Sequence, residues 1–199
     1  EIVSLEAWTR QDRRTAGWPM TFEERQQAIA DIRLIPAVPE DVQITFRRAK
    51  DSYICGHFRY DFFTVSTHYA ALAVEAAIKA RWSAGLPQTV TVSCDGASTE
   101  VAFPTYTRLL SVCRSRGWRS RPLANGQRLP TFPDGLLDWL VRQRIVTGWD
   151  RKQLKGMLSM RNALSHVEHA STETPATGVL RLAAELINTM FATLGSNCV

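Results

Sequence analysis

Residues 69–80 are Tyr-Ala-Ala-Leu-Ala-Val-Glu-Ala-Ala-Ile-Lys-Ala, the centre of the most strongly helical stretch in the chain. Alanine has the highest intrinsic helix propensity and leucine is close behind it. We therefore expect a helix over roughly residues 59–83, ended by Gly85 and Pro87. Almost every face of this helix is apolar, which is typical of a helix at the centre of a core. The stretch predicts a mainly α-helical fold built around it.

One narrow strip of this helix is polar. At about 100° per residue, His68, Glu75 and Lys79 lie within about 40° of one another. Glu75 precedes Lys79 by four residues, the order that favours an ion pair along a helix. Two interpretations stay open: Glu75 is satisfied by Lys79 at the helix edge, or it pairs with Arg161 across the bundle and fixes the orientation of that guanidinium.

A second helix, predicted over roughly residues 150–167, carries the most informative side chains. Its apolar stripe consists of Leu154, Met157, Leu158 and Leu164. Arg161 lies in the middle of that stripe, where a guanidinium carries a desolvation cost unless it is paired. Asn162 and His166, four residues apart, lie one above the other at its edge. A fixed positive charge, an amide and a group that titrates near neutral pH therefore lie close together, which suits chemistry on a phosphate.

The segment Arg161-Asn162-Ala163-Leu164-Ser165-His166 resembles the R-x4-6-H motif of the HEPN superfamily, in the form in which Asn follows the Arg. As in that family, the motif lies late in a helix with one more long helix to follow. The resemblance covers roughly residues 57–195 and includes the Ala-rich helix with its internal Glu75. It implies a HEPN-like antiparallel helical bundle in which Arg161, Asn162 and His166 are the catalytic residues.

The residue types also suggest how such a site would act on RNA. No carboxylate cluster has metal-ligand spacing, and no Ser or Cys lies in a recognisable nucleophile motif, so we expect neither a metal nor a cofactor. RNA supplies its own nucleophile, the 2′-hydroxyl. His166 would serve as the acid or base, Arg161 would contact the phosphate oxygens in bidentate fashion, and Asn162 would hold His166 or the phosphate. His169 is a second candidate proton carrier.

The resemblance implies a metal-independent endoribonuclease of bacterial toxin–antitoxin or anti-phage defence systems. HEPN domains dimerise and bring two motifs together, so it also implies a homodimer through the motif-bearing helix. Implied partners are RNA and an antitoxin, an additional domain or an effector protein. The alternative is a non-catalytic HEPN-like module that binds nucleic acid, a nucleotide or a protein. A third reading is the accessory subunit of a nucleotidyltransferase pair.

The distribution of charge points to an anionic partner. The 199-residue chain has a net charge of +5, and no Asp or Glu occurs between Val101 and Pro133. Within the predicted basic loop at about 114–130, we expect RNA contacts from Arg114, Arg116, Arg119 and Arg121. A solvated basic surface loop explains the same pattern equally well.

The remaining segments define two predicted parts. Residues 1–50 are expected to form a small N-terminal α+β appendage or a partner-binding arm, and the sequence pattern fits either. It has a helix at about 22–34 behind a Thr21–Glu24 capping box, and a strand containing Val42, Ile44 and Phe46. Residues 51–199 form the helical domain, which has an inserted hairpin at about 88–103 turning at Asp95-Gly96.

Further helices of this domain are expected at about 105–116 and from Asp134 to Val146, the latter capped by Asp134 and ended by Gly148. Asp150 is expected to cap the motif helix. The last helix would open with Pro175 and carry the stripe Leu180, Ala183, Ala184, Ile187, Phe191 and Leu194.

Cysteine usage and hydropathy bound the cellular context. The four cysteines are scattered without a C-x2-C pair, which favours reduced thiols over a zinc site or a disulfide framework. No apolar run reaches the roughly 18 residues that a membrane span needs. We expect a cytoplasmic protein that does not bind a membrane. Because the sequence starts at Glu1 rather than Met, we expect an excised domain or a processed product.

Overall fold

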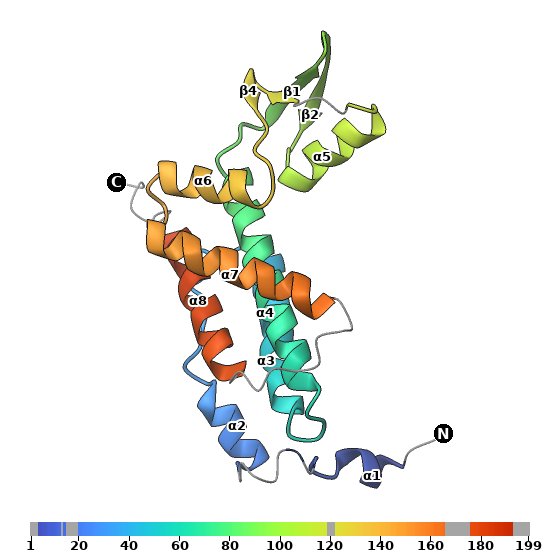
Figure 1. The fold of residues 1–199 in the computed structure, drawn as a ribbon, viewed down its shortest axis with the longest axis vertical. Helices are drawn as coiled ribbons and strands as arrows, with labels where there is room; N and C mark the ends of the chain where they lie inside the picture. The colour runs from blue at the N-terminus through green and yellow to red at the C-terminus, as the bar shows by residue number, and fades with distance from the viewer. Residues whose placement is uncertain (1–3, 13, 15–19, 119–121, 166–175, 193–199) are drawn as a thin grey trace. The chain divides into compact units, whose positions relative to one another are not determined.

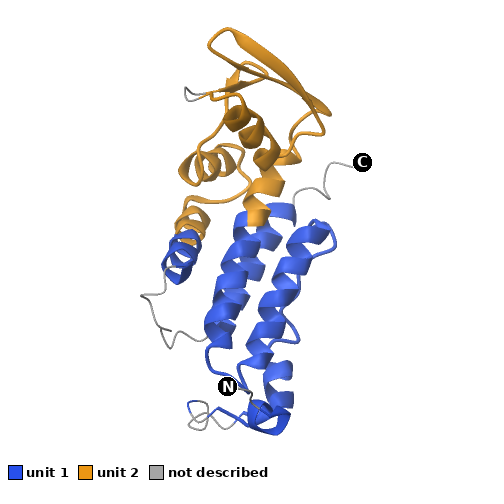
Figure 2. Cartoon of the chain, turned by 90° about the vertical axis from the view of Figure 1, so that its right-hand side faces the viewer, with its two compact units in different colours: residues 1–75, 156–199 blue, residues 76–155 orange. Residues whose placement is uncertain are grey.

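The computed structural model describes residues 4–12, 14, 20–118, 122–165 and 176–192 (Figure 1). Over these residues it is mainly helical, with eight α-helices and one small four-stranded antiparallel sheet. The predicted fold class is confirmed at this level. The chain divides into two compact units, residues 1–75 with 156–199 and residues 76–155 (Figure 2). None of the described helices is both long enough and apolar enough to cross a membrane.

The first unit is entirely helical where it is described. Its elements are α1 (Leu5–Thr9), α2 (Phe22–Ala28), α3 (Glu40–Cys55), α4 (Phe62–Ser83) up to Glu75, α7 (Gly148–Ser165) from Gly156 on, and α8 (Ala176–Ala192). Helix α3 packs against both α2 and α8. The predicted stripe of α8 is buried at Leu180, Ala183, Ala184, Ile187 and Phe191. Pro175 and Leu194 lie outside the described residues.

The predicted strand around Val42 is wrong, because these residues belong to helix α3. Its buried residues are Val42, Phe46, Ala49 and Tyr53, spaced by four, three and four, which is the period of a helix. Ile44, which the alternating pattern placed beside Val42 and Phe46, is 39% exposed. Three alternating residues are too few to distinguish the two periods. The predicted boundary after residue 50 falls inside this helix.

Helix α2 starts as predicted and ends early. The Thr21 side chain accepts the Glu24 N–H while the Glu24 carboxylate accepts the Thr21 N–H, so the capping box is confirmed. The helix stops at Ala28 instead of continuing to about Leu34, because tertiary partners bind the backbone that follows it. The Lys50 ammonium donates to the Ile32 carbonyl at 2.8 Å. The Asn188 side chain accepts the Ile35 N–H at 2.9 Å.

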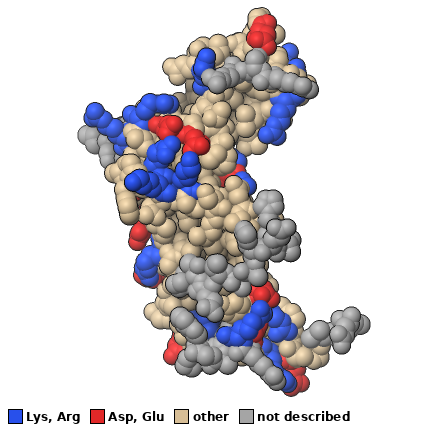
Figure 3. Space-filling model, viewed as in Figure 1, with Lys and Arg blue, Asp and Glu red and all other residues tan. Residues whose placement is uncertain are grey.

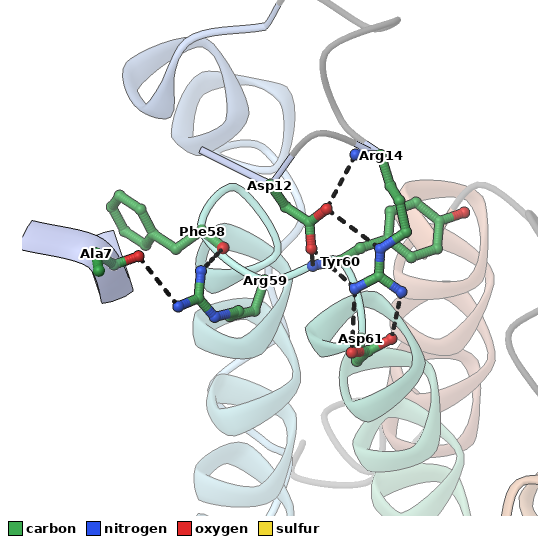
Figure 4. A network of polar contacts seen from close by, with 7 residues as sticks. All are labelled: Ala7, Asp12, Arg14, Phe58, Arg59, Tyr60 and Asp61. Carbon is green, nitrogen blue, oxygen red and sulfur yellow. Dashed lines mark hydrogen bonds and ion pairs between the residues drawn. The ribbon is translucent and has the colours of Figure 1, made fainter. Parts of the chain in front are cut away.

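The N-terminal segment is fastened to the loop between α3 and α4 by a polar network (Figure 4). The Asp12 carboxylate accepts the Tyr60 N–H at 3.0 Å and the Arg14 guanidinium at 2.8 Å. Arg14 also donates to Asp61 at 2.9 Å and lies over the Tyr60 ring. Arg59 donates to the Ala7 carbonyl at 3.3 Å. Residues near the start of the chain thus share one network with residues 58–61.

The second unit contains the sheet. Strands β1 (Thr89–Cys94) and β2 (Ala97–Ala102) form the predicted hairpin, and both turn residues, Asp95 and Gly96, have the positive φ that this tight turn requires. Val90, Val92 and Cys94 alternate on its buried face. The sheet continues beyond the hairpin in the order β2-β1-β3-β4.

The predicted basic loop at 114–130 is in part a second hairpin, of β3 (Leu123–Ala124) and β4 (Gln127–Arg128). It turns at Asn125-Gly126, a favoured hairpin dipeptide. Strand β3 pairs with β1, and the Asn125 side chain accepts the Thr91 N–H at 2.9 Å. The turn dipeptide was visible in the sequence, but strands of two residues carry no periodicity.

Two predicted helix caps in this unit are wrong. Helix α6 (Asp134–Arg142) begins after Pro133 with no side-chain cap, and Asp134 instead accepts the Lys155 ammonium at 2.9 Å. Helix α6 ends at Arg142, and Arg144, two residues further on, has a positive φ, which a continuing helix does not allow. Thr147, rather than Asp150, caps α7: its hydroxyl accepts the Asp150 N–H at 3.2 Å, and the Asp150 carboxylate accepts the Thr147 N–H at 2.8 Å. Gly148 is therefore the first residue of α7.

Helix α5 (Tyr106–Ser115) agrees with its prediction. The Thr105 side chain accepts the Arg108 N–H at its start, and Gly117 follows its end with a φ of 67°. Such a left-handed residue is the usual way to end a helix, and glycine adopts it without strain.

Candidate functional site

The candidate site is built around an ion pair between helices α4 and α7. Arg161 Nε donates to Glu75 Oε2 at 2.8 Å, and Arg161 Nη2 binds the same oxygen. The Glu75 side chain is 11% exposed and that of Arg161 is 27% exposed. The pair with Arg161, one of the two interpretations of the polar strip, is therefore present in the structure. Both residues belong to the first unit.

The surroundings explain why these two charges meet. On α4, Ala71 and Val74 are fully buried next to Glu75, so the carboxylate has left bulk water and needs a cation. On α7, Met157 and Leu158 are 2% and 4% exposed, and Arg161 continues their stripe. The ion pair offsets the free-energy cost of removing each charge from water. The contact with Glu75 also holds the guanidinium in one orientation.

Asn162 extends the pair toward solvent. Its side-chain oxygen accepts Arg161 Nη1 at 2.7 Å, and Asn162 itself is exposed. One turn later, the Ser165 hydroxyl donates to the Arg161 carbonyl at 2.9 Å. The bonds to Glu75 and Asn162 use three of the five N–H groups of the guanidinium. Arg161 is thus held on one side by Glu75 and on another by Asn162, and part of its side chain stays open to solvent.

His68 is a titrating group near Arg161 that the sequence analysis placed in the polar strip without assigning it a role. It precedes Glu75 by two turns of α4. Burial lowers the pKa of its imidazole, and the positive charge of Arg161 lowers it further. Its Nδ1 is buried without a hydrogen-bond partner in the part of the chain that the structure describes. The signal that could have nominated His68 was its helical register with Glu75.

Several predicted site residues lie outside the described residues: His166 and His169 in the segment after α7, and Arg119 and Arg121 in the basic loop. The described part of the site is therefore Glu75, Arg161 and Asn162, with His68 coupled electrostatically to Arg161.

Arg114 and Arg116 belong to the second unit, at the end of α5, and both are exposed. Lys and Arg side chains are visible over α5 in Figure 3. Arg116 donates to the Thr99 hydroxyl at 3.2 Å and its guanidinium lies over the Trp118 ring. A cation held beside an aromatic ring is a pattern common on nucleic-acid-binding surfaces.

Neither a metal ligand set nor a relative identifies the site. Among the described residues, no group of three or more His, Cys, Asp or Glu could hold a metal ion. In comparisons with protein-family models, curated proteins and solved structures, none matched this chain. The geometry around Arg161 and the motif in the sequence are therefore the features that bear on function.

Proposed function

We propose that this protein is a metal-independent endoribonuclease of the HEPN type. The observation that carries the proposal is the arrangement of Arg161, oriented by the buried Glu75 and bonded to Asn162 at the solvent edge. A guanidinium fixed in this way is suited to bind the two non-bridging oxygens of a phosphodiester. The same Arg and Asn open the motif that resembles the HEPN superfamily.

The reaction would proceed by attack of the RNA 2′-hydroxyl. The 2′-oxygen bonds to phosphorus as its proton passes to a base, and the bond to the 5′-oxygen breaks as that oxygen receives a proton from an acid. The products are a 2′,3′-cyclic phosphate and a 5′-hydroxyl. Arg161 would neutralise the charge that develops on the phosphate oxygens, and His166 would carry a proton.

His68 would supply the second titrating group that this reaction needs. Its lowered pKa keeps the imidazole neutral at pH 7, which is the form that accepts a proton. Within one chain, His68 as base and His166 as acid would then cover both proton transfers. A homodimer that joins two motifs is the other way to obtain two such groups, and it stays a proposal.

The interface of such a dimer would not be the apolar stripe of α7 that carries Arg161. Leu154, Met157 and Leu158 are at most 4% exposed within the single chain, so that stripe offers little area to a partner. A dimer through α7 would use its exposed positions, such as Ser159 and Asn162. A role in toxin–antitoxin or anti-phage defence, with an antitoxin or effector as partner, is proposed on the resemblance alone.

One observation favours the alternative, a non-catalytic binding module. Arg161 is bonded within its own chain to Glu75 and Asn162, and buried arginines in proteins are commonly paired for structure. In that case the motif would stabilise the α4–α7 pairing, and His166 would be dispensable.

The test is cleavage of labelled single-stranded RNA and transfer RNA in excess chelator, with end-group analysis of the products. We expect cyclic-phosphate ends, and a loss of at least about 100-fold in rate for His166→Ala, the lower range for acid–base catalysis. Arg161→Lys keeps the charge and removes the planar fork, so it should also cleave poorly. His169→Ala tests the second candidate proton carrier: a loss as large as that of His166→Ala would assign a proton transfer to His169 as well.

Circular dichroism of each variant separates lost chemistry from lost folding. Cleavage by His166→Ala at the normal rate would disprove the assignment of His166. RNA binding by the intact protein without any cleavage, unchanged in His166→Ala, would favour the binding module.

A further inference from the structure

An open groove of about 480 Å³ lies along helices α2 and α3, in the first unit. Its apolar lining includes Ile29, Ile32 and Phe46, each at most 3% exposed, together with the half-buried Leu34 and Ile54. The groove shares no residue with the Arg161 site. Its volume falls in the range of about 300–1,000 Å³ that is usual for small-molecule sites.

Three cations line this groove beside its apolar residues and the polar Gln26, Gln43 and Asp51: Arg33, Arg47 and Lys50. Lys50 comes from α3, and its ammonium is positioned by the bond to the Ile32 carbonyl at 2.8 Å. Burial lowers the pKa of Lys50, and the positive charge of Arg33 lowers it further. Arg33 and Lys50 are therefore like charges that act on each other at a partly desolvated place.

The acidic groups nearby do not balance these cations. Among the described residues that line the groove, Asp51 is the one carboxylate. Asp31 also acts on Lys50, but its two oxygens accept the guanidinium of Arg181 from α8 at 2.7 and 3.3 Å. Three cations thus face one carboxylate in the lining, and a bound anion would relieve their repulsion.

We propose that this groove binds a small amphiphilic anion, a carboxylate or phosphate attached to an apolar chain or ring. The head group would lie between Arg33 and Arg47, and the apolar part would lie against Leu34 and Ile54, the apolar lining residues that are still partly exposed. Burial of the apolar part supplies affinity, and the cations fix the orientation. The small volume favours such a molecule over a segment of a partner protein. This site is independent of the proposed ribonuclease activity.

The test uses 8-anilinonaphthalene-1-sulfonate, an anionic aromatic probe whose fluorescence rises in apolar sites, with the full chain. Decanoate and decyl phosphate, below their micelle concentrations, should displace it competitively. Comparing the two shows whether a carboxylate or a phosphate head is preferred. Decyltrimethylammonium has the same chain with a cationic head and should not compete, and inorganic phosphate alone should compete at least about tenfold more weakly.

The variants are Arg47→Glu and its neighbour Arg48→Glu. Both arginines are exposed on α3, but only Arg47 lines the groove. Arg47→Glu should raise the dissociation constant for decanoate at least about tenfold, as expected when a charge contact becomes a repulsion. Arg48→Glu should leave it within about twofold. Melting curves establish that both variants fold.

Four results would overturn the proposal. Equal displacement by decyltrimethylammonium would show a merely apolar surface, and equal displacement by inorganic phosphate would show a simple anion site. Equal effects of the two variants would place binding outside the groove. Displacement by a synthetic acidic amphipathic peptide, but not by decanoate or decyl phosphate, would reassign the groove to a protein partner.

Discussion

Arg25 lies in an environment that conflicts with its charge. It is 4% exposed, and its guanidinium lies 5.3 Å from the centroid of the Phe63 ring. Its Nε and Nη2 are buried without hydrogen-bond partners in the described part of the chain. Two buried guanidinium nitrogens without hydrogen-bond partners cost more free energy than one interaction with a ring returns.

We therefore predict that Arg25→Met raises the free energy of unfolding by about 1 kcal/mol, because Met keeps the length of the side chain and removes the desolvated charge. Arg25→Ala should lower it by about 2 kcal/mol or more through the cavity it leaves. Urea unfolding at neutral pH measures both. If the Met variant were clearly less stable than the parent, the charge of Arg25 would be stabilising after all.

At the scale of single residues, the sequence indicated which side chains carry unusual chemistry but not which side chains lie beside them. Arg161 could be recognised because a cation interrupted an apolar stripe, and Glu75 because a carboxylate interrupted an apolar helix. Their pairing was one of two open interpretations, since the helical register of α4 does not specify what faces it. The electrostatic coupling of His68 to Arg161 depends on distances between helices, which no single helical pattern contains.

The elements of the chain are connected by contacts that only folding creates, and the N-terminal segment is the clearest case. Asp12 accepts hydrogen bonds from both Arg14 and the Tyr60 backbone (Figure 4). These bonds hold the pKa of its carboxyl well below its usual value. Because the folded-state pKa is the lower one, the stabilisation is complete above the unfolded pKa of about 3.9 and is lost as the pH falls through the folded pKa.

We predict that Asp12→Asn lowers the free energy of unfolding at pH 7 by about 1.5–3 kcal/mol, the usual contribution of hydrogen bonds to a charged group. The difference from the parent should shrink as the pH falls from about 4 toward 2. Asp61→Asn is the matched control. Its carboxylate binds the same Arg14 but is 72% exposed, so the change should stay within about 0.5 kcal/mol. Urea unfolding across this pH range decides, and a difference that is independent of pH would contradict the role of the Asp12 charge.

Local signals predicted the element starts and turns that they encode directly. The Thr21–Glu24 capping box and the Asp95-Gly96 hairpin are confirmed because their contacts lie within a few residues of each other. The strand predicted around Val42 failed because a short alternation was preferred over a longer helical period. Helix α2 ends early because Lys50 and Asn188, distant in sequence, bind the backbone beyond it.

For the whole molecule, the net charge of +5 is modest, so any affinity for RNA must come from local clusters of cations. Basic and acidic side chains lie side by side over α6 and the start of α7 in Figure 3, where Arg151 and Lys155 bind Asp138 and Asp134. Arg114 and Arg116 lie instead in a stretch without acidic residues.

We predict that RNA binding weakens with salt, and that replacing both Arg114 and Arg116 with Gln reduces the slope of log affinity against log salt by about 1.4, since each phosphate contact on a single strand contributes about 0.7. Fluorescence anisotropy with labelled single-stranded RNA between about 50 and 300 mM KCl measures the slope. Gln at both Arg10 and Arg48, which are exposed elsewhere, should leave the slope unchanged. Equal slopes for the two double variants would exclude a specific contact by Arg114 and Arg116.

The sequence by itself determined the helical class, the buried stripes of α4, α7 and α8, the first hairpin and the polar residues that interrupt apolar faces. Each of these follows from periodicity, propensity or contacts within a few residues. Only the tertiary structure decided that Arg161 binds Glu75, where α2 ends, that a second hairpin extends the sheet, and that Arg33, Arg47 and Lys50 gather around one groove. The reason is physical: these features depend on which helix faces are brought together in space, and a linear pattern specifies what a face needs to bury or to pair without specifying its partner.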